Sequence, residues 1–432
     1  MIIVRLISSV REARRGWSRK QGDTVRKRTA RLGLALLAVL ALALAGCASE
    51  DAVDTGSQAA SSGESSPGVT DSEITFGMAT PLTGNASSLG IDGQKGAEVF
   101  IKWLNDQGGT NGRKWKLVAQ DDGFDLQKKA TTVQYLIQQE QVFGIWGDVG
   151  STAVSALPLI NEQKVPYLFP YALAKQMIDP VQPYVFMDVP MADMQEHALS
   201  DWIADNEPGD HKIGLLTLNS ADGGDAVSGF KAGKAGKYVV GEQQYERTAT
   251  SWQPQLVALR SAGVTDIVIH GSDVWTAKIL TEAKGLGMTD VQFYGSSGSV
   301  TPQVFALAGD AAEGLRAVAI NAPSTATDVP GVKEFTDAFA KYEPGYKPGV
   351  FALHSWSSGL ILAAGMKGIQ GDTVTRDGLV ASLEKLKNFD TKGITAPVSF
   401  TKDNHEGVDK VMLVQGKGGQ WVTMTGFIGT TS

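Results

Sequence analysis

The sequence predicts an α/β protein with two Rossmann-like lobes, each built on a parallel central sheet. From Glu73 onward, short apolar segments alternate with longer amphipathic segments. This alternation is typical of parallel strands joined by crossover helices. The rhythm pauses near Val189-Pro190 and restarts at His211 with similar spacing. A chain of 432 residues is long enough for two domains with separate cores.

The first part of the pattern predicts four strands and three helices. The strands are Ile74–Met78, Lys116–Ala119, Phe143–Trp146 and Val165–Phe169, and the helices are Ser87–Gln107, Leu126–Glu140 and Ser151–Gln163. In each helix the apolar residues recur at a spacing that puts them on one face.

The second part repeats this order and then changes character. The strands are His211–Thr217, Tyr238–Tyr245, Asp266–His270, Val291–Tyr294 and Leu315–Ile320, and the helices are Asp225–Gly233, Trp252–Ala262 and Val274–Lys284. Three further helices are expected at 331–342, 350–367 and 375–386. The tail from Ile394 to Met424 is β-rich, and Asp403–Gly407 is expected as the turn between two strands.

The N-terminal segment has the layout of a bacterial lipoprotein signal. An apolar run of fourteen residues, Leu32–Ala45, follows a basic stretch and is shorter than the roughly 18 to 20 residues of a membrane-spanning helix. Leu44-Ala45-Gly46 precedes Cys47, the single cysteine of the chain. We expect residues 1–46 to be removed and Cys47 to carry lipid. The alternative is an ordinary cleaved signal with a buried Cys47. The charged leader is long, which suggests a true translation start further in, at Val25.

Residues 47–68 are expected to form a disordered tether because they are rich in Ser, Gly, Ala and acids and contain no aromatic residue. Removing residues 1–46 takes away ten basic and two acidic side chains, so the net charge changes from −7 to −15. A surface this acidic argues against nucleic-acid binding and suits an exported domain. If Cys47 carries lipid, the fold contains no disulfide.

An ordered series of motifs resembles the branched-chain amino-acid binding proteins of ABC importers. The motifs are Gly77-Met78-Ala79-Thr80-Pro81-Leu82-Thr83-Gly84, Gly93-Gln94-Lys95-Gly96-Ala97-Glu98, Trp103 to Lys114, Asp121-Asp122, Gly147 to Thr152, Val165-Pro166-Tyr167, Gly285-Leu286-Gly287 and Tyr294-Gly295. The resemblance covers roughly residues 73–420. It implies a type I periplasmic-binding-protein fold, in which three hinge strands join two lobes that close on a ligand.

The expected lobe boundaries follow from this fold and from the segmentation above. Lobe 1 is expected to comprise 69–189 plus 322–397, and lobe 2 to comprise 190–321 plus 398–432. The hinge crossings are then expected near 188–191, 320–323 and 396–400.

Gly150, Ser151 and Thr152 are the first candidate ligand-binding residues. A predicted strand ends before them and a predicted helix begins at Ser151, so free backbone N–H groups and the helix dipole favour an anion there. The resemblance implies that a ligand carboxylate binds at this turn. The alternative is that Ser151 or Thr152 only caps the helix.

A second expected ligand loop contains Tyr171 and Ala172, but here the sequence departs from the family pattern. Where members of the family have Thr in this loop, the chain has Leu173, and where they have a Tyr-Gly pair it has Asp222-Gly223. The turn that usually holds an acid in the family has Ser297 here. A buried ammonium needs an anion. Asp222 or Asp273 could supply one from neighbouring loops, although acids in such loops are more often solvated.

Four aromatic residues, Trp146, Phe169, Tyr171 and Trp275, would make the cleft apolar if they face it. An apolar cleft suits an aromatic or aliphatic carboxylate or an amide, while the alternative for each ring is core packing.

Enzymatic activity is not expected. No dinucleotide, P-loop or nucleophile-elbow motif occurs, and the five His residues are scattered. We expect no cofactor and no metal. The expected function is a lipid-anchored, monomeric solute receptor on the extracytoplasmic face of a bacterial membrane, which delivers a small ligand to a permease with its ATPase. The alternative is a sensor that uses the same fold to signal to a membrane receptor.

Overall fold

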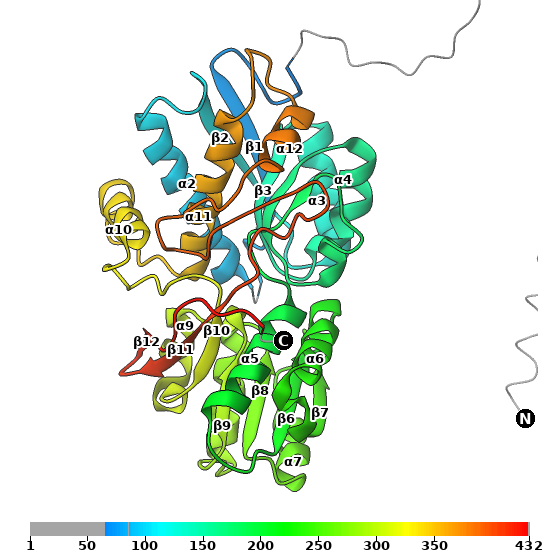
Figure 1. The fold of residues 1–432 in the computed structure, drawn as a ribbon, viewed down its shortest axis with the longest axis vertical. Coiled ribbons are helices and arrows are strands. Elements are labelled where there is room, and N and C mark those ends of the chain that lie inside the picture. Colours follow the sequence, from blue (N-terminus) through cyan, green and yellow to red (C-terminus); the bar gives the residue numbers. More distant parts are fainter. Residues whose placement is uncertain (1–64, 85, 431–432) are drawn as a thin grey trace, which may run out of the picture. The chain divides into compact units, whose positions relative to one another are not determined.

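The computed structural model describes residues 65–84 and 86–430, and two sheets organise this part of the chain (Figure 1). The predicted signal peptide, Cys47 and residues 48–64 of the predicted tether lie outside the described residues.

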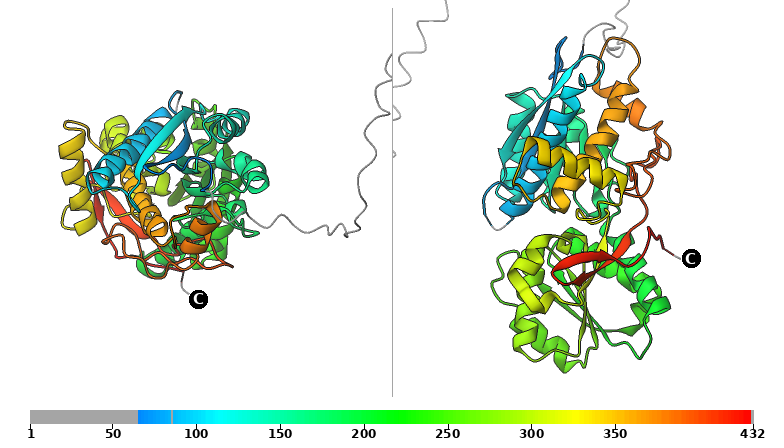
Figure 2. Two further views of the ribbon diagram at one scale, coloured as in Figure 1. Left: turned by 90° about the horizontal axis from the view of Figure 1, so that it is seen from above. Right: turned by 90° about the vertical axis from the view of Figure 1, so that its left-hand side faces the viewer.

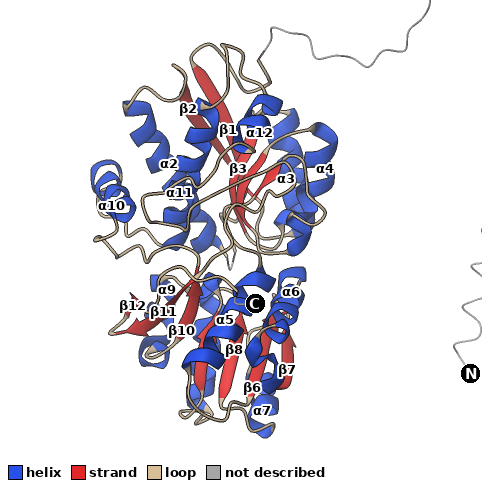
Figure 3. Cartoon of the chain, viewed as in Figure 1, coloured by secondary structure: helices blue, strands red, loops and turns tan. Residues whose placement is uncertain are grey.

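The first sheet has five strands in the order β2-β1-β3-β4-β5, and all its pairings are parallel. The strands are β1 (Glu73–Thr80), β2 (Lys114–Asp121), β3 (Gly144–Val149), β4 (Tyr167–Tyr171) and β5 (Val185–Phe186). The connecting helices are α2 (Ser87–Asp106), α3 (Leu126–Gln138), the short η1 (Ala153–Ala156), α4 (Leu157–Gln163) and η2 (Lys175–Met177). Three helices from later in the sequence, α10 (Pro330–Tyr342), α11 (Val350–Lys367) and α12 (Arg376–Leu383), lie on the same side of the molecule as this sheet (Figures 1 and 3).

The second sheet has seven strands in the order β12-β11-β10-β9-β8-β6-β7. Five are parallel: β6 (Ile213–Leu218), β7 (Val239–Tyr245), β8 (Asp266–His270), β9 (Gln292–Gly295) and β10 (Arg316–Ala319). The hairpin β11 (Met412–Lys417) and β12 (Gln420–Thr423) adds two antiparallel strands. The helices are α5 (Ala192–Asn206), α6 (Ala221–Ala232), α7 (Gln253–Ser261), α8 (Asp273–Gly285) and α9 (Pro302–Ala308), with η3 (Lys234–Tyr238), η4 (Ser297–Ser299) and η5 (Gly309–Ala312).

This architecture confirms the predicted α/β class with parallel-dominated sheets. The chain passes between the two sheets in three segments: between β5 and α5, between β10 and α10, and between α12 and β11. Figure 2 lets the reader follow these segments from two further sides. Each expected hinge crossing falls within one of them, and the exact lobe boundaries stay a prediction.

The predicted helix Ser151–Gln163 is wrong in one respect, because it is two elements, η1 and α4. Pro158 lies in the first turn of α4. Proline has no N–H to donate to a preceding carbonyl and is tolerated only in a first turn, so the α-helix has to begin at Leu157. The helix dipole expected at Ser151 is therefore weaker than a continuous helix would supply.

The predicted turn at Asp403–Gly407 is also wrong. The hairpin turn lies at Gly418-Gly419, where both residues have positive φ angles of 59° and 75°. Two glycines of positive φ suit a two-residue hairpin. Asp403–Gly407 instead belongs to the segment between α12 and β11 and forms only isolated bridges, such as Met187 with Glu406.

The helices α2 and α11 cross closely, and this contact explains a motif noted in the sequence. A Cβ added to Gly96 would lie 2.3 Å from the Ala352 carbonyl oxygen, so only glycine allows this approach. The buried Asp92 carboxylate accepts hydrogen bonds from the N–H groups of Gly349 and Ala352, at 2.9 Å each, and so satisfies donors at the start of α11. Nearly every residue of α11 is buried.

The described chain enters the first lobe at the amino ends of its strands. Ser66 N–H donates to the Val374 carbonyl (2.9 Å), and Thr75 N–H donates to the Gly68 carbonyl (2.8 Å). A Cβ on Gly68 would lie 2.2 Å from Phe143 N. Ser65–Gly68, the end of the predicted tether, is thus hydrogen-bonded to the folded body. None of the described helices has the length and apolarity needed to cross a membrane.

Candidate functional site

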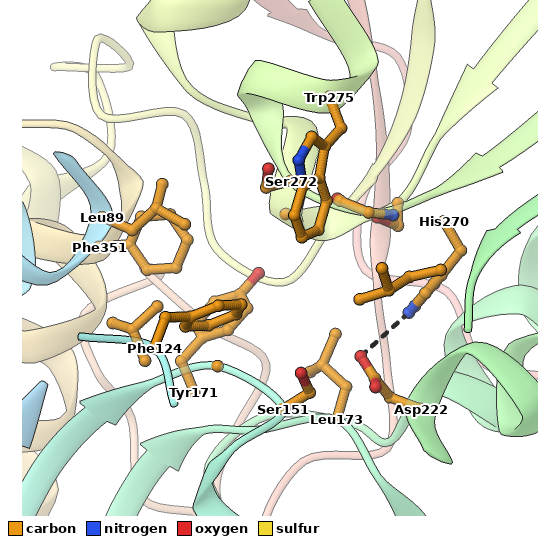
Figure 4. Close-up of a pocket in the computed structure, with 16 residues that line it drawn as sticks. Leu89, Phe124, Ser151, Tyr171, Leu173, Asp222, His270, Ser272, Trp275 and Phe351 are labelled. Carbon is orange, nitrogen blue, oxygen red and sulfur yellow. Dashed lines mark hydrogen bonds and ion pairs between the residues drawn. The ribbon is translucent and has the colours of Figure 1, made fainter. Parts of the chain in front are cut away.

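A pocket with a cavity volume of about 70 Å³ lies where the carboxyl ends of strands from both sheets meet (Figure 4). The first sheet contributes residues that follow β2, β3 and β4, and the second contributes residues at the ends of β6, β8 and β9. The carboxyl ends of parallel strands are the usual ligand-binding edge of open α/β sheets. The pocket is lined by Leu89, Phe124, Val149, Gly150, Ser151, Tyr171, Leu173, Leu218, Asp222, His270, Gly271, Ser272, Trp275, Ser296, Gly298 and Phe351.

The turn after β3 presents unused donors. Gly150 adopts φ +114°, and the Ser151 hydroxyl is buried without a hydrogen-bond partner among the described residues. Within the described chain, the backbone N–H groups of Ser151 and Thr152 donate to no acceptor, whereas Gly150 N–H donates to the Tyr171 carbonyl at 3.0 Å. Thr152 is fully buried and does not line the pocket. Three donors at one turn are suited to a carboxylate.

The carboxyl end of β4 and the loop after it supply an aromatic wall. The ring of Tyr171 packs against Phe351 and His354, with centroid separations of 4.8 and 5.2 Å. Burial raises the pKa of Tyr171, and the nearby Ser297 hydroxyl offsets part of this rise. Leu173 lines the pocket, whereas Ala172 is buried and does not. This wall is therefore apolar.

Asp222 and His270 form the charged part of the pocket. The Nε2 atom of His270 lies 3.4 Å from Asp222 Oδ2, and Nδ1 lies 3.3 Å from Glu196 Oε1. Burial alone lowers the pKa of His270, but the two carboxyl groups outweigh burial and raise it to about 9. Burial raises the pKa of Asp222, but His270, Ser220 and Arg247 together outweigh burial and hold that pKa below its usual value. Asp222 is therefore an anion, and its Oδ1 atom has no partner in the part of the chain described.

A second cation lies close to this pair. The guanidinium carbon of Arg247 lies 5.0 Å from the centre of the Phe124 ring. Burial lowers the pKa of Arg247, and the charge of Asp222 opposes this shift. One nitrogen of Arg247, Nη1, is buried and unpartnered among residues 65–84 and 86–430.

Of the eight predicted ligand residues, the structure brings four into the pocket lining: Gly150, Ser151, Tyr171 and Asp222. Ser297 lies between two lining residues, Ser296 and Gly298, and its buried hydroxyl has no partner among the described residues.

Asp273 has a structural role instead. Its carboxylate accepts hydrogen bonds from Val274 N–H and the Thr301 hydroxyl, both at 2.7 Å. Burial raises its pKa. Because both oxygens are already used and the residue does not line the pocket, Asp222 is the better candidate for an ammonium partner.

Of the four aromatic candidates, only Tyr171 and Trp275 line the pocket. Trp146 lies in the core of the first lobe, where its indole N–H donates to the Ser358 hydroxyl at 3.0 Å. Phe169 stacks on Phe400 in the same core, at a centroid separation of 6.1 Å.

Sequence reasoning missed Phe124, His270 and Arg247. His270 could have been found, since it ends a predicted parallel strand, at the edge where ligands bind. Phe124 had no such signal, because its position depends on a left-handed turn (φ +60°) and on space left by Gly150.

Among residues 65–84 and 86–430, no group of three or more His, Cys, Asp or Glu side chains is arranged to hold a metal ion. The geometry is that of a binding pocket between two α/β lobes. A model of the family described as periplasmic binding protein matches residues 73–420, which is most of the chain, so the chain belongs to the periplasmic binding protein family. This confirms the resemblance seen in the motifs.

Known proteins agree with this assignment. The chain is 26% identical over 297 residues to the leucine-, isoleucine-, valine-, threonine-, and alanine-binding protein of Pseudomonas aeruginosa, over 68% of this chain and 78% of that protein. The fatty acid ABC transporter substrate-binding protein from Thermomonospora curvata has a TM-score of 0.76 at 24% identity, over 84% of this chain and 94% of that one. A branched chain amino acid ABC transporter from Thermus thermophilus with bound valine has a TM-score of 0.75 at 21% identity, and the match covers 82% of this chain and 96% of that one.

The chain is therefore a type I periplasmic binding protein of the branched-chain amino-acid type, a solute-binding protein and not an enzyme. Membership of this family indicates an extracytoplasmic location.

Proposed function

We propose that this chain is the lipid-anchored substrate-binding subunit of an ABC importer and that its ligand is a small α-amino acid with an apolar side chain. One observation carries the ligand class: Ser151, whose hydroxyl and N–H are unused, and Asp222, whose Oδ1 is unused, line the same mostly apolar pocket. The unused N–H of Thr152 lies in the same turn as Ser151. The ligand carboxylate would accept hydrogen bonds from the Ser151-Thr152 turn. The ligand ammonium would donate to Asp222, and its side chain would lie against Tyr171 and Trp275.

The charge of Asp222 is the reason to prefer an amino acid over a simple acid. An unpaired ammonium inside an apolar pocket costs several kcal/mol, so it needs an anion close by. Asp222 has a pKa below its usual value and is ionised at neutral pH.

A second candidate is a small carboxylate or amide without an amine. His270 supports it, because a protonated imidazole already faces Asp222 and compensates its charge. The two candidates differ by a single ammonium group.

A thermal-shift screen of the mature protein separates them. The probes are three matched pairs: L-valine and 3-methylbutanoate, L-leucine and 4-methylpentanoate, L-phenylalanine and 3-phenylpropanoate, with leucinamide as the amide. A compound at 100 times its Kd stabilises the folded state by about 2.7 kcal/mol, which gives a clear shift in Tm. We expect the amino acids to shift Tm more than their partners. Larger shifts by the des-amino acids would favour the second candidate, and no shift by any probe would reject both.

Asp222→Asn tests the ammonium contact directly. Hydrogen bonds to charged groups contribute about 1.5–3 kcal/mol, so the amino-acid probes should lose roughly 10- to 150-fold in affinity. The des-amino probes should lose much less. Asp205→Asn is the matched control, because Asp205 also lies in the second lobe but is exposed and pairs with Lys234 at 2.6 Å. Equal losses for both probe series would reject an ammonium at Asp222.

The proposed anchor is tested separately at Cys47. Metabolic labelling with a radioactive fatty acid should label the wild type, and Cys47→Ala should abolish the label and release the protein from membranes. Labelled Cys47→Ala protein would contradict the assignment. Ala48→Ser serves as the control substitution.

Transport, rather than sensing, is tested by uptake of the amino acid that binds best in the screen. Deletion of the gene should abolish high-affinity uptake, and a wild-type copy should restore it. Unchanged uptake together with a lost transcriptional response would favour the sensor alternative.

A further inference from the structure

The aromatic ring of Phe124 closes the pocket from the first lobe. Phe124 lies in the turn between β2 and α3 and lines the pocket together with Trp275 and Leu218 of the second lobe. Its ring also packs against the apolar cluster of the second lobe that contains both of these residues. Because Phe124 belongs to the first lobe and packs against residues of the second, this contact has to break when the lobes separate.

The backbone holds Phe124 in an unusual conformation. Its φ is +60°, a left-handed value that bulky residues rarely adopt. Phe124 N–H donates to the Asp122 carboxylate at 2.7 Å, and Asp122 forms a fully buried ion pair with Lys129. Strained residues of this kind persist where the surroundings fix them and are concentrated at ligand sites.

The first lobe leaves space for the ring at Gly150. A Cβ on Gly150 would lie 2.1 Å from Cε2 of Phe124, and the φ of Gly150 is +114°. The ring thus occupies the volume that a side chain at residue 150 would need, directly over the turn that carries Ser151.

The second lobe holds the ring from the other side. Arg247, which follows β7, lies over the Phe124 ring at 5.0 Å. A cation over an aromatic face is attracted to it, more strongly when both are partly removed from water. The contact joins residues carried by different sheets, so it exists only while the lobes are together.

We propose that Phe124 is the specificity-determining roof of the pocket, which sets the largest side chain the closed protein accepts, and that Arg247 latches this roof in the closed state. The size-limiting role of Phe124 rests on the proposed function, because it assumes a ligand side chain in this pocket. The role of Arg247 as a latch does not depend on the proposed function. The two residues have separable effects: shortening Phe124 changes which ligands fit, whereas removing the Arg247 charge changes how long the closed state lasts.

The first measurement is affinity for L-valine, L-leucine and L-phenylalanine, with their des-amino partners, by calorimetry. Phe124→Ala should raise the ratio of phenylalanine to valine affinity at least tenfold, and the same trend should hold for 3-phenylpropanoate over 3-methylbutanoate. Phe124→Leu, which keeps more of the packing, should show a smaller change in the same direction if the alanine variant does not fold. An unchanged ratio of phenylalanine to valine affinity in the variant that folds would overturn the roof.

The second measurement is the dissociation rate of the same probes. Arg247→Gln should raise it by about 2- to 30-fold for every member of the series, the range expected for a cation–π contact. It should not change the size order, and it should have no further effect in a Phe124→Leu background. Lys237→Gln is the matched control, because Lys237 lies 4.9 Å from the ring of Tyr238, a residue of the second lobe itself. Equal effects of the two glutamine variants would overturn the latch.

A third measurement needs no ligand. Small-angle X-ray scattering of the ligand-free protein should give a larger radius of gyration for Arg247→Gln and Phe124→Leu than for wild type and Lys237→Gln. If no probe of either series binds, the proposed function is wrong. The scattering measurement still tests whether Arg247 holds the lobes together, because it needs no ligand. Identical radii for all four proteins would overturn the latch even if the amino acids bind.

Discussion

His270 and Asp222 form a buried ion pair that joins the carboxyl end of β8 to the first turn of α6, with 3.4 Å between Nε2 and Oδ2. Both side chains line the ligand pocket. The pair therefore links the charge of the pocket to the stability of the second lobe.

The first prediction concerns pH. Binding of a proton to His270 is stronger in the folded protein, since its pKa rises from 6.5 to about 9. A raised folded pKa gives a contribution that is complete below about pH 6.5 and is lost as pH rises through about 9. The size of this shift corresponds to a contribution on the order of 3 kcal/mol. Urea unfolding at a series of pH values should show stability falling across this window.

One other group titrates inside that window: burial lowers the pKa of His211, but its contacts with Asp266 and Glu207 outweigh burial and raise it above 6.5. The buried acids titrate lower. Burial raises the pKa of Asp148 to about 6 and that of Glu406 to about 7. Their raised values lower stability as pH rises, but mainly below about pH 7. The slope between about pH 7 and 9 therefore reports mainly on His270 and to a smaller degree on His211, and His270→Gln should flatten most of it. A wild-type slope that survives in this variant would contradict the assignment.

A second prediction separates Ser151 from Thr152. Ser151→Ala removes a hydroxyl that lines the pocket and should weaken binding of L-leucine about 2- to 10-fold, the effect of about 0.5–1.5 kcal/mol for one hydrogen bond. Thr152→Val removes a buried, unpartnered hydroxyl but keeps the backbone N–H, so affinity should not change. Calorimetry measures both. A loss confined to Thr152→Val would reverse the two roles.

A third prediction concerns the buried Lys129. Its ammonium is fully buried and pairs with Asp122 and Asp148, while Asp148 also accepts a hydrogen bond from Tyr167. Lys129→Met leaves two carboxyl groups without their cation and should cost about 3–5 kcal/mol of unfolding free energy.

The neighbouring Lys128 is a matched control for this change. It is exposed and pairs with Asp121 at 2.7 Å, so Lys128→Met should cost no more than about 1 kcal/mol. Denaturant unfolding compares the two variants. Equal losses would show that the buried cluster does not depend on its cation.

A fourth prediction compares two glycines of α2. Gly96→Ala would force its Cβ against the Ala352 carbonyl and should destabilise the protein by about 1–3 kcal/mol. Gly93→Ala meets its nearest atom at 3.6 Å, an ordinary contact, and should be neutral or stabilise by up to about 1 kcal/mol through helix propensity. Thermal unfolding of both variants is the measurement. A Gly96→Ala protein as stable as wild type would mean that α2 and α11 can separate without cost.

Most of the fold could be predicted from the sequence, because most of its elements carry clear periodicity. The strand β5 and the helices α9 and α5 were missed, and α5 shows why. Its buried face includes Gln195, Glu196, Ser200 and Asp201, so it lacks a continuous apolar stripe. Some of those polar groups have partners far away in sequence, such as His270 for Glu196 and the Ala235 N–H for the Ser200 hydroxyl. Local patterns do not report such partners.

The candidate site could be predicted only in part, for the same reason. Ser151, Tyr171 and Asp222 follow strands, so their edge of the sheet was predictable. Asp273 also lies just after a strand and Trp146 lies within β3, yet Thr301 and Ser358 hold their side chains outside the pocket. Whether a side chain turns into the pocket or into the core is decided by these long-range contacts.

The hydrogen bonds of Ser66 and Gly68 have a practical consequence for biosensor design. They lie at the amino ends of β1 and β3, whereas the pocket lies at the carboxyl ends of β3 and β4. A protein immobilised through its N-terminal segment is thus attached at one edge of the first sheet, and the ligand pocket lies at the opposite edge. A chip coupled in this way should leave the pocket accessible, and a fluorophore for reading out ligand capture belongs on the second lobe.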